Sequence, residues 1–155
     1  MDEIYSRGFM TDLSKVRRNE TSQLVYHKTL NYGDCILEKR AAAAAGINEK
    51  IFINTKGQIS EGTVCNVFFV RKNMIYTPQL SCGLLPGILR EYIMERFQVT
   101  ETIIYPDELM YYEECFVTNS LMGVMPVRQL GNICFPHRAK ADEVREVYEK
   151  EKMSL

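Results

Sequence analysis

The chain has 155 residues, 46% hydrophobic and 25% charged, which is ordinary usage for one globular domain with its own core. Its net charge of -1 and pI near 6.2 argue against proteins that bind nucleic acid or anionic membranes, because these usually need a basic surface. No apolar run is long enough to span a membrane, and the first residues lack the pattern of a signal peptide. We expect a cytoplasmic protein that binds neither nucleic acid nor membrane.

The cysteines and histidines follow no disulfide or metal-binding pattern. The five cysteines are scattered and include no CxxC pair, and there are only two histidines. We expect reduced thiols that mostly fill the core, and no metal site. His27 and His137 have no companion nearby in the sequence for a catalytic dyad, so packing or surface positions are expected for both.

The first part of the chain is predicted to hold short strands followed by one long helix. The strand candidates are three short segments separated by breakers, at residues 3–7, 14–18 and 24–26. The helix is expected over residues 32–45, because it contains five consecutive alanines and Gly46 supplies a C-terminal stop.

The middle of the chain is predicted to form two strand pairs. A strand at residues 50–54 turns at Gly57 and returns over residues 58–61. A second hairpin pairs residues 66–70 with residues 74–77 around a short polar turn.

Helices and strands alternate in the last part. An irregular stretch at residues 78–86 leads into an amphipathic helix at residues 87–97. The remaining elements are a strand at 99–105, a helix start at 106–112, a strand at 115–118, a hairpin of 125–130 with 133–135, and a charged helix at 138–152. We therefore expect one mixed α/β (α+β) domain.

Lys28 is a candidate amine nucleophile. It follows four residues with little or no charge and precedes the expected helix. A lysine at the end of an extended apolar run loses part of its hydration, which lowers its pKa and makes the amine more reactive. The alternative is an ordinary strand-end lysine with its ammonium in water.

Glu61 is a candidate buried acid. It lies on an expected strand, next to Gly62 and within an apolar stretch. A carboxylate is costly to bury unless it has a partner, so burial here would indicate a function. The alternative is an edge-strand glutamate that faces water.

Two further segments suit an anion. Residues 85–90 place Gly87 directly before a helix, where free backbone N–H groups and the helix dipole attract negative charge. Residues 118–120 are threonine, asparagine and serine, which suit a phosphate or carboxylate. Both segments have a simpler alternative, since a plain turn into a helix and local caps use the same residues.

One cofactor would use all four pieces together. Pyridoxal 5'-phosphate needs a lysine for its aldehyde, an acid for its ring nitrogen and an anion site for its phosphate. Each piece is common, but their combination in one short domain is not.

The order of these pieces resembles the fold-type IV, or class IV aminotransferase, family of pyridoxal-phosphate enzymes. That group includes branched-chain and D-amino-acid aminotransferases and aminodeoxychorismate lyase. The resemblance covers about residues 16–130 through the stretches RRNETSQLVYHKTLNY, AAAAAGINEKIFINTKGQISEGTVCNVFFV, IYTPQLSCGLLPGILR and CFVTNSLMGVMPVRQL. It implies a curled, barrel-like mixed sheet with flanking helices, the C-terminal domain of the D-amino-acid aminotransferase-like fold.

The resemblance also implies roles at the ring of the cofactor. Lys28 would be the Schiff-base lysine and proton shuttle, and Glu61 would pair with the pyridine nitrogen. Arg18 or Tyr32 would lie near the ring hydroxyl.

At the other end of the cofactor, the resemblance implies a phosphate site. The backbone of Ile88 and Leu89, with Asn119 and Ser120, would hold the phosphate. Leu89 departs from the family pattern, where many relatives have threonine, so a backbone contact would survive and a hydroxyl contact would be lost.

Within the family, HKTLNY and NSLMGVMPV look most like aminodeoxychorismate lyase, which removes pyruvate from 4-amino-4-deoxychorismate to leave 4-aminobenzoate for folate synthesis. A branched-chain or D-amino-acid aminotransferase would use the same residues, so that alternative stays open. A non-catalytic fragment of such an enzyme is the third alternative.

Relatives of this family carry an N-terminal domain ahead of the segment that matches Met1. We therefore expect residues 1–155 to form a single domain, the cofactor-bearing C-terminal domain, with the N-terminal domain absent. The expected partners are a small amino-acid-like substrate and a second copy of the chain in a homodimer, because the apolar surface next to a half site would otherwise be exposed.

Overall fold

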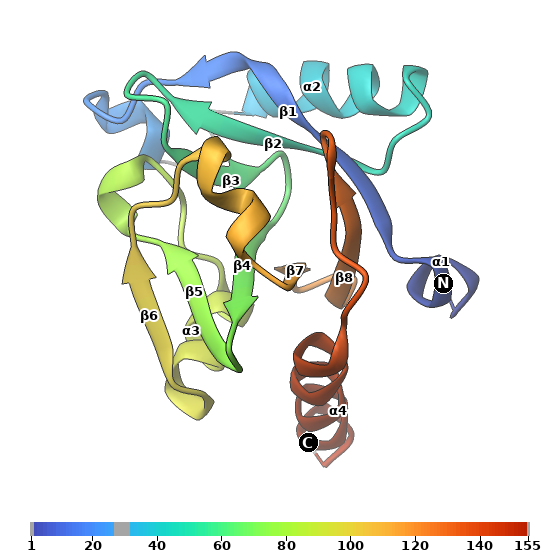
Figure 1. Ribbon diagram of the computed structural model, residues 1–155. Coiled ribbons are helices and arrows are strands. Elements are labelled where there is room, and N and C mark those ends of the chain that lie inside the picture. Colours follow the sequence, from blue (N-terminus) through green and yellow to red (C-terminus); the bar gives the residue numbers. More distant parts are fainter. Residues whose placement is uncertain (1, 27–31, 155) are drawn as a thin grey trace.

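A computed structural model describes residues 2–26 and 32–154 of the chain (Figure 1). Lys28 and His27 lie outside the described residues. The helices are α1 (Asp2–Arg7), α2 (Tyr32–Ala44), α3 (Ile88–Arg96) and α4 (Ala139–Met153), with 3-10 helices η1 (Gln23–Tyr26), η2 (Leu80–Cys82) and η3 (Pro106–Tyr111). The strands are β1 (Phe9–Arg18), β2 (Glu49–Asn54), β3 (Ile59–Gly62), β4 (Asn66–Arg71), β5 (Met74–Pro78), β6 (Val99–Thr102), β7 (Glu114–Asn119), β8 (Gly123–Leu130) and β9 (Ile133–Cys134).

These nine strands form one mixed sheet across the described ranges, in the order β3-β2-β1-β8-β7-β4-β5-β6, with β9 paired to β8. Strand β1 is parallel to both of its neighbours, β2 and β8, whereas β4, β7 and β8 pair antiparallel. The N–H of Ile59 on β3 donates to the carbonyl of Ile104, just after β6, at 2.8 Å. Because β3 and β6 are the two ends of the strand order, this bond shows that the sheet curls almost closed. The expected barrel-like mixed sheet is confirmed.

The sheet separates two apolar cores, and strand β4 contributes to both. Val67 and Phe69 point into the curled interior, which η3 and β8 also fill. Phe68 and Val70 point to the outer face, where α3 and α4 pack. The Phe68 ring stacks on that of Phe116 with centroids 4.9 Å apart. This alternation with period two explains why β4 is a continuous apolar run, since it is covered on both faces.

Most predicted elements are confirmed within a residue or two, because their signals are local. The alanine-rich helix appears as α2, and the second hairpin appears as β4 and β5. Its two turn residues, Lys72 and Asn73, have φ of 49° and 65°, which matches the turn type that suits the twist of paired strands. The predicted turn at Gly57 also forms, with φ of 78°.

Two predicted strands are wrong. Residues 3–7 belong to helix α1, whose last carbonyls, of Tyr5 and Ser6, accept hydrogen bonds from Arg138 Nη1 at 2.9 and 3.1 Å. Residues 24–26 belong to the 3-10 helix η1, where the Tyr26 hydroxyl donates back to the Glu20 carbonyl at 3.0 Å. In the first case a contact with a distant segment overrides a weak local preference, and in the second the residue bonds back to the chain just upstream.

Other boundaries differ, and the strand expected at residues 14–18 begins earlier, at Phe9. The strand expected at 99–105 ends at Thr102, because the chain then leaves to make the Ile104 bond to β3. The helix expected after Pro106 is a short 3-10 helix, and residues 80–82 of the irregular stretch form another. Among the described segments, no helix is both long enough and apolar enough to cross a membrane.

Candidate functional site

Arg18 and Glu61 form a buried ion pair across three strands. Arg18 ends β1 and Glu61 lies on β3, and β2 runs between them. The guanidinium of Arg18 lies 4.1 Å from the centre of the Phe52 ring on β2, and its Nη2 lies 3.3 Å from Glu61 Oε2. The two side chains are only 4% and 9% exposed. Glu61 is therefore the buried, partnered carboxylate of the two alternatives, not a solvated edge residue.

Burial dominates the ionisation of Glu61. It raises the pKa of Glu61 from 4.5 to about 7, although the Arg18 guanidinium and the N–H of Leu85 both lower it. The nearby Glu49 carboxylate raises it further. Near neutral pH the side chain is thus poised between acid and carboxylate, and one more positive charge would favour the carboxylate.

Arg18 keeps donors that no described residue uses. Its Nη2 lies against Glu61 and also donates to Cys35 Sγ on α2 at 3.1 Å. Its Nε and Nη1 are buried and have no hydrogen-bond partner among the described residues. An unpaired buried donor of a charged group is costly. These two nitrogens point to an acceptor supplied from outside the described protein groups.

Three hydrogen bonds fix the turn that precedes α3. The N–H of Leu85 donates to Glu61 Oε1 at 3.0 Å. Asn66 Nδ2 donates to the Leu85 carbonyl at 3.0 Å, and the N–H of Gly87 donates to Asn66 Oδ1 at 3.0 Å. A Cβ on residue 87 would lie 2.9 Å from that same oxygen, so a larger residue there would displace the Asn66 carboxamide. The turn is thereby held from β3 and β4 at once.

The first backbone N–H groups of helix α3 have no acceptor within the helix. Gly87 is its N-cap and has no side chain to cap the first turn, so the N–H groups of Ile88 and Leu89 have no partner inside the helix. The Ile88 side chain is 81% exposed, whereas that of Leu89 is 3% exposed and packs in the outer core. Leu89 can therefore serve an anion only through its backbone.

The Asn119–Ser120 turn is at the end of β7, the strand that pairs with β4. Asn119 Oδ1 accepts from the N–H groups of Leu121 and Met122 at 3.0 and 2.8 Å, and Asn119 Nδ2 donates to the Val64 carbonyl at 3.0 Å. The carboxamide of Asn119 thus acts as a turn former, which was one of its two alternatives. The Ser120 side chain is exposed.

Thr118 adds a polar group that the sequence analysis did not single out as a site residue of its own. It is 1% exposed, and its Oγ1 is buried without a hydrogen-bond partner among the described residues. Thr118 is paired across the sheet with Asn66, so both side chains lie on the face that α3 covers. A buried hydroxyl without a described partner therefore lies beside the residue that holds the start of α3.

A second buried carboxylate, Glu49, was missed by the sequence analysis. It is 0% exposed and accepts hydrogen bonds from Thr63 Oγ1 at 2.5 Å and from Cys65 Sγ at 3.3 Å. It thereby holds the loop that connects Glu61 to β4. The feature of the sequence that relates to Glu49 is Gly62, where a Cβ would lie 3.1 Å from Glu49 Oε2.

The structure thus brings Arg18, Glu61 and the start of α3 into one connected set, and links the Asn119 turn to it through the loop at Val64. Lys28 lies outside the described residues. Tyr32 starts α2, but its side chain is not described. Within the described ranges, no group of three histidine, cysteine, aspartate or glutamate residues is arranged to hold a metal ion.

Known proteins resemble this chain in sequence and in structure. The family described as "Amino-transferase class IV" matches residues 6–130. A "Probable branched-chain-amino-acid aminotransferase" of Thermotoga maritima is 36% identical over 134 residues, covering 83% of this chain and 48% of the relative.

Two solved structures share the fold over nearly the whole chain. A "Putative 4-amino-4-deoxychorismate lyase" of Legionella pneumophila is 27% identical with a TM-score of 0.82, covering 92% of this chain and 55% of that one. The branched-chain amino acid aminotransferase of "T.th." with pyridoxamine 5'-phosphate is 26% identical with a TM-score of 0.87, covering 97% and 52%. The chain spans about half the length of these relatives. It belongs to the class IV aminotransferase family, whose members depend on pyridoxal phosphate.

Proposed function

We propose that this chain is the cofactor-bearing domain of a pyridoxal-phosphate enzyme and that the connected set around Glu61 binds the cofactor. The observation that carries the proposal is the buried Arg18–Glu61 pair, whose guanidinium keeps two nitrogens without a described partner and whose carboxylate is bonded to the turn before α3. When bound, pyridoxal phosphate supplies an electron-withdrawing ring that stabilises negative charge beside the substrate nitrogen.

The ring end of the cofactor fits Glu61 and Arg18. Glu61 is buried and both of its oxygens are held by the protein, which supports its role as the fixed acid that pairs with a protonated ring nitrogen. Its pKa of about 7 in the free protein means that a positive ring nitrogen would hold it as the carboxylate. The two remaining nitrogens of Arg18 suit the negatively charged ring hydroxyl.

The phosphate end fits the start of α3. The N–H groups of Ile88 and Leu89 and the positive end of the helix dipole favour a dianion. The exposed Ser120 hydroxyl and the buried Thr118 hydroxyl are additional donors nearby. Asn119 contributes by shaping the turn, because its side chain is already bonded to the protein.

Lys28 is the residue proposed to take the cofactor aldehyde and to carry protons. This assignment rests on the family resemblance of HKTLNY. The amine of a catalytic lysine can take a proton from the substrate carbon and return it to another atom. Tyr32 remains proposed as a neighbour of the ring hydroxyl on the same ground.

For the reaction, we propose the lyase, which releases pyruvate from 4-amino-4-deoxychorismate. The support is the resemblance of HKTLNY and NSLMGVMPV, together with the Legionella structure, whose name is that of such a lyase. The second candidate is amino transfer to a keto acid, which the Thermotoga relative supports because its name is that of a branched-chain aminotransferase.

The cofactor proposal is tested by titrating the chain with pyridoxal phosphate. We expect a visible absorbance band that Lys28→Ala abolishes and that Lys150→Ala, an exposed lysine on α4, leaves unchanged. A band of equal strength in Lys28→Ala would remove Lys28 from the site. Pyruvate release from aminodeoxychorismate, measured against amine transfer to a keto acid, separates the two reactions.

We also propose a cytoplasmic homodimer. Large apolar side chains around the site are exposed, Leu121 at 94%, Ile88 at 81% and Val64 at 49%, and a second copy would cover such a surface. The cysteines form no disulfide among the described residues, which suits a reducing compartment. A sharp monomer in analytical ultracentrifugation would contradict the dimer.

A further inference from the structure

Asn66, the first residue of β4, is assigned no contact with the proposed cofactor, yet both ends of its carboxamide bond to one turn. The side chain is buried at 5% exposure. Its Nδ2 donates to the Leu85 carbonyl and its Oδ1 accepts from the Gly87 N–H, both at 3.0 Å. One planar group therefore bridges residues 85 and 87 and prevents the peptide between them from rotating freely.

The carboxamide does both jobs because its nitrogen donates and its oxygen accepts. Aspartate would accept from Gly87 but would repel the Leu85 carbonyl, and an apolar residue would leave both backbone groups without this partner. The arrangement also replaces a missing local cap. In a capping box, a side chain within the helix accepts from the N–H of the N-cap residue. Here that acceptor comes from another strand, and Gly87 itself offers no side chain.

The same turn is bonded to Glu61. The Leu85 N–H donates to Glu61 Oε1, so the two polar groups of Leu85 are held by different strands, the N–H by β3 and the carbonyl by β4. The distance between the acid and the start of α3 is thereby set by two strands of one sheet. A rigid ligand with a ring nitrogen at one end and a phosphate at the other needs such a fixed spacing.

We propose that Asn66 is a positioning residue that fixes the first N–H groups of α3 relative to Glu61, so that the phosphate and the ring of one cofactor are bound together. This inference rests on the proposed cofactor site. Thr118 is paired with Asn66 across the sheet, and its buried hydroxyl has no described partner. This hydroxyl is an independent sign that a ligand with hydrogen-bond acceptors, such as a phosphate, binds at the start of α3.

The test compares cofactor with and without its phosphate. In the full chain, we measure the affinities of wild type and Asn66→Ala for pyridoxal phosphate and for pyridoxal, with inorganic phosphate as a competitor. We expect Asn66→Ala to weaken pyridoxal phosphate about tenfold, as expected for losing one to two hydrogen bonds, and to weaken pyridoxal less than about twofold. Hydrogen exchange at residues 87–90 should increase in the variant.

A matched control separates positioning from general destabilisation. Thr77→Val removes another buried bond to β4, from Thr77 Oγ1 to the Val67 carbonyl at 2.7 Å, which involves neither Asn66 nor the turn before α3. We expect it to lower the melting temperature without changing the ratio of the two affinities. If Asn66→Ala also leaves that ratio unchanged, Asn66 is only structural and the inference is overturned.

A second variant pair keeps the test sharp if Asn66→Ala folds poorly. Gly87→Ala places a Cβ against Asn66 Oδ1, so it should weaken the phosphate-containing ligand in wild type but add little in the Asn66→Ala background. Additive losses would contradict the coupling. If the wild-type chain binds pyridoxal phosphate no tighter than pyridoxal, the proposed cofactor site is wrong and this inference is wrong with it. If the wild-type chain prefers pyridoxal phosphate but the losses from the two substitutions add, only the inference about Asn66 is wrong.

Discussion

Arg18 and Arg138 differ in how completely their guanidinium groups are bonded. Arg138 uses all three nitrogens: Nε and Nη2 reach Asp142 at 3.2 Å, and Nη1 donates to the carbonyls of Tyr5 and Ser6. Its guanidinium also lies 4.4 Å from the centre of the Tyr5 ring. Arg18, which is more deeply buried, leaves Nε and Nη1 without a described partner.

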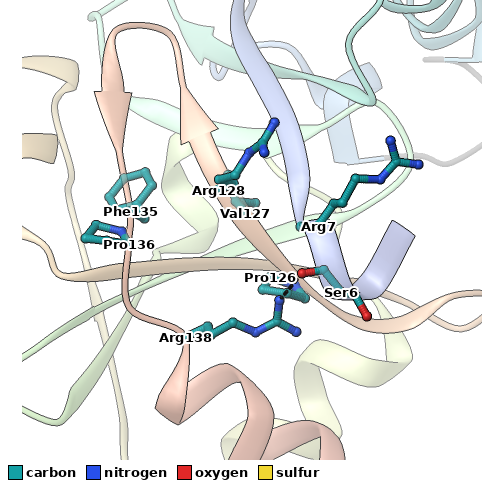
Figure 2. A pocket seen from close by; sticks show the side chains of 9 residues that line it. Ser6, Arg7, Pro126, Val127, Arg128, Phe135, Pro136 and Arg138 are labelled. Carbon is teal, nitrogen blue, oxygen red and sulfur yellow. Dashed lines mark hydrogen bonds between the residues drawn. The ribbon is translucent and has the colours of Figure 1, made fainter. Parts of the chain in front are cut away.

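The comparison separates a structural arginine from one that we propose to bind the cofactor. Arg138 lines a hollow of about 250 Å³ between α1, β8 and the start of α4, and Figure 2 shows it directed at Ser6. The hollow also contains Arg7 and Arg128, yet Arg7 pairs with Glu3 and Arg128 Nε lies 3.3 Å from Met10 Sδ. Positive charge around a hollow is thus less informative than a buried donor without a partner.

The largest expected effect is on how the free energy of unfolding depends on pH, and it comes from Glu61 in the Arg18 region. The native pKa of Glu61, about 7, lies above its ordinary value of 4.5, so the native state holds this proton more tightly than the unfolded state. Stability from this group is therefore present below about pH 4.5 and is lost as pH rises to about 7, by about 3 kcal/mol. Glu61→Gln should remove this loss, as measured by urea unfolding at pH 5 and pH 8. Parallel wild-type and variant profiles would show that Glu61 titrates normally.

The next prediction compares the two arginines directly through cofactor affinity. Arg18→Met should weaken pyridoxal phosphate by about 10- to 100-fold, because it removes charge-assisted donors. Arg138→Met should leave the affinity within about twofold, because its donors are already used by the protein. Fluorescence titration of both variants at pH 7 measures the ratio.

Arg18→Lys refines that experiment. Lysine keeps the positive charge near Glu61 but loses the planar donors that have no described partner. Full recovery of affinity in Arg18→Lys would mean that charge alone matters. Equal losses in Arg18→Met and Arg138→Met would remove the distinction between the two arginines.

The smallest expected effect concerns the stability of the Arg138 region. Arg138→Met should lower the free energy of unfolding by about 2 kcal/mol, because it leaves the last carbonyls of α1 without their donor. Arg7→Met is the control and should change stability by less than about 0.5 kcal/mol, since its pair with Glu3 is largely exposed. Thermal melting of both variants without cofactor checks this. A similar shift in the two would mean that Arg138 is no more structural than Arg7.

The sequence by itself determined the elements whose causes are local. The alanine run with Gly46 makes α2, and the polar turn at Lys72 and Asn73 makes the β4–β5 hairpin. The sequence also predicted that Gly87 precedes a helix and that Glu61 lies on a strand. The order of these residues along the chain resembles that of one family. These features depend on neighbours a few residues away, so a single sequence carries them.

Only the tertiary structure decided which polar groups meet. Arg18 reaches Glu61 by crossing Phe52 on the strand between them, and Asn66 reaches the turn before α3 from another strand. Glu49 is buried beneath the loop after Glu61 for the same kind of reason. Residues 3–7 became a helix because Arg138, far along the chain, bonds the end of it. Each of these contacts joins segments that are distant in the sequence. Such segments are buried against one another only in the folded sheet, so the sequence alone does not reveal the contacts.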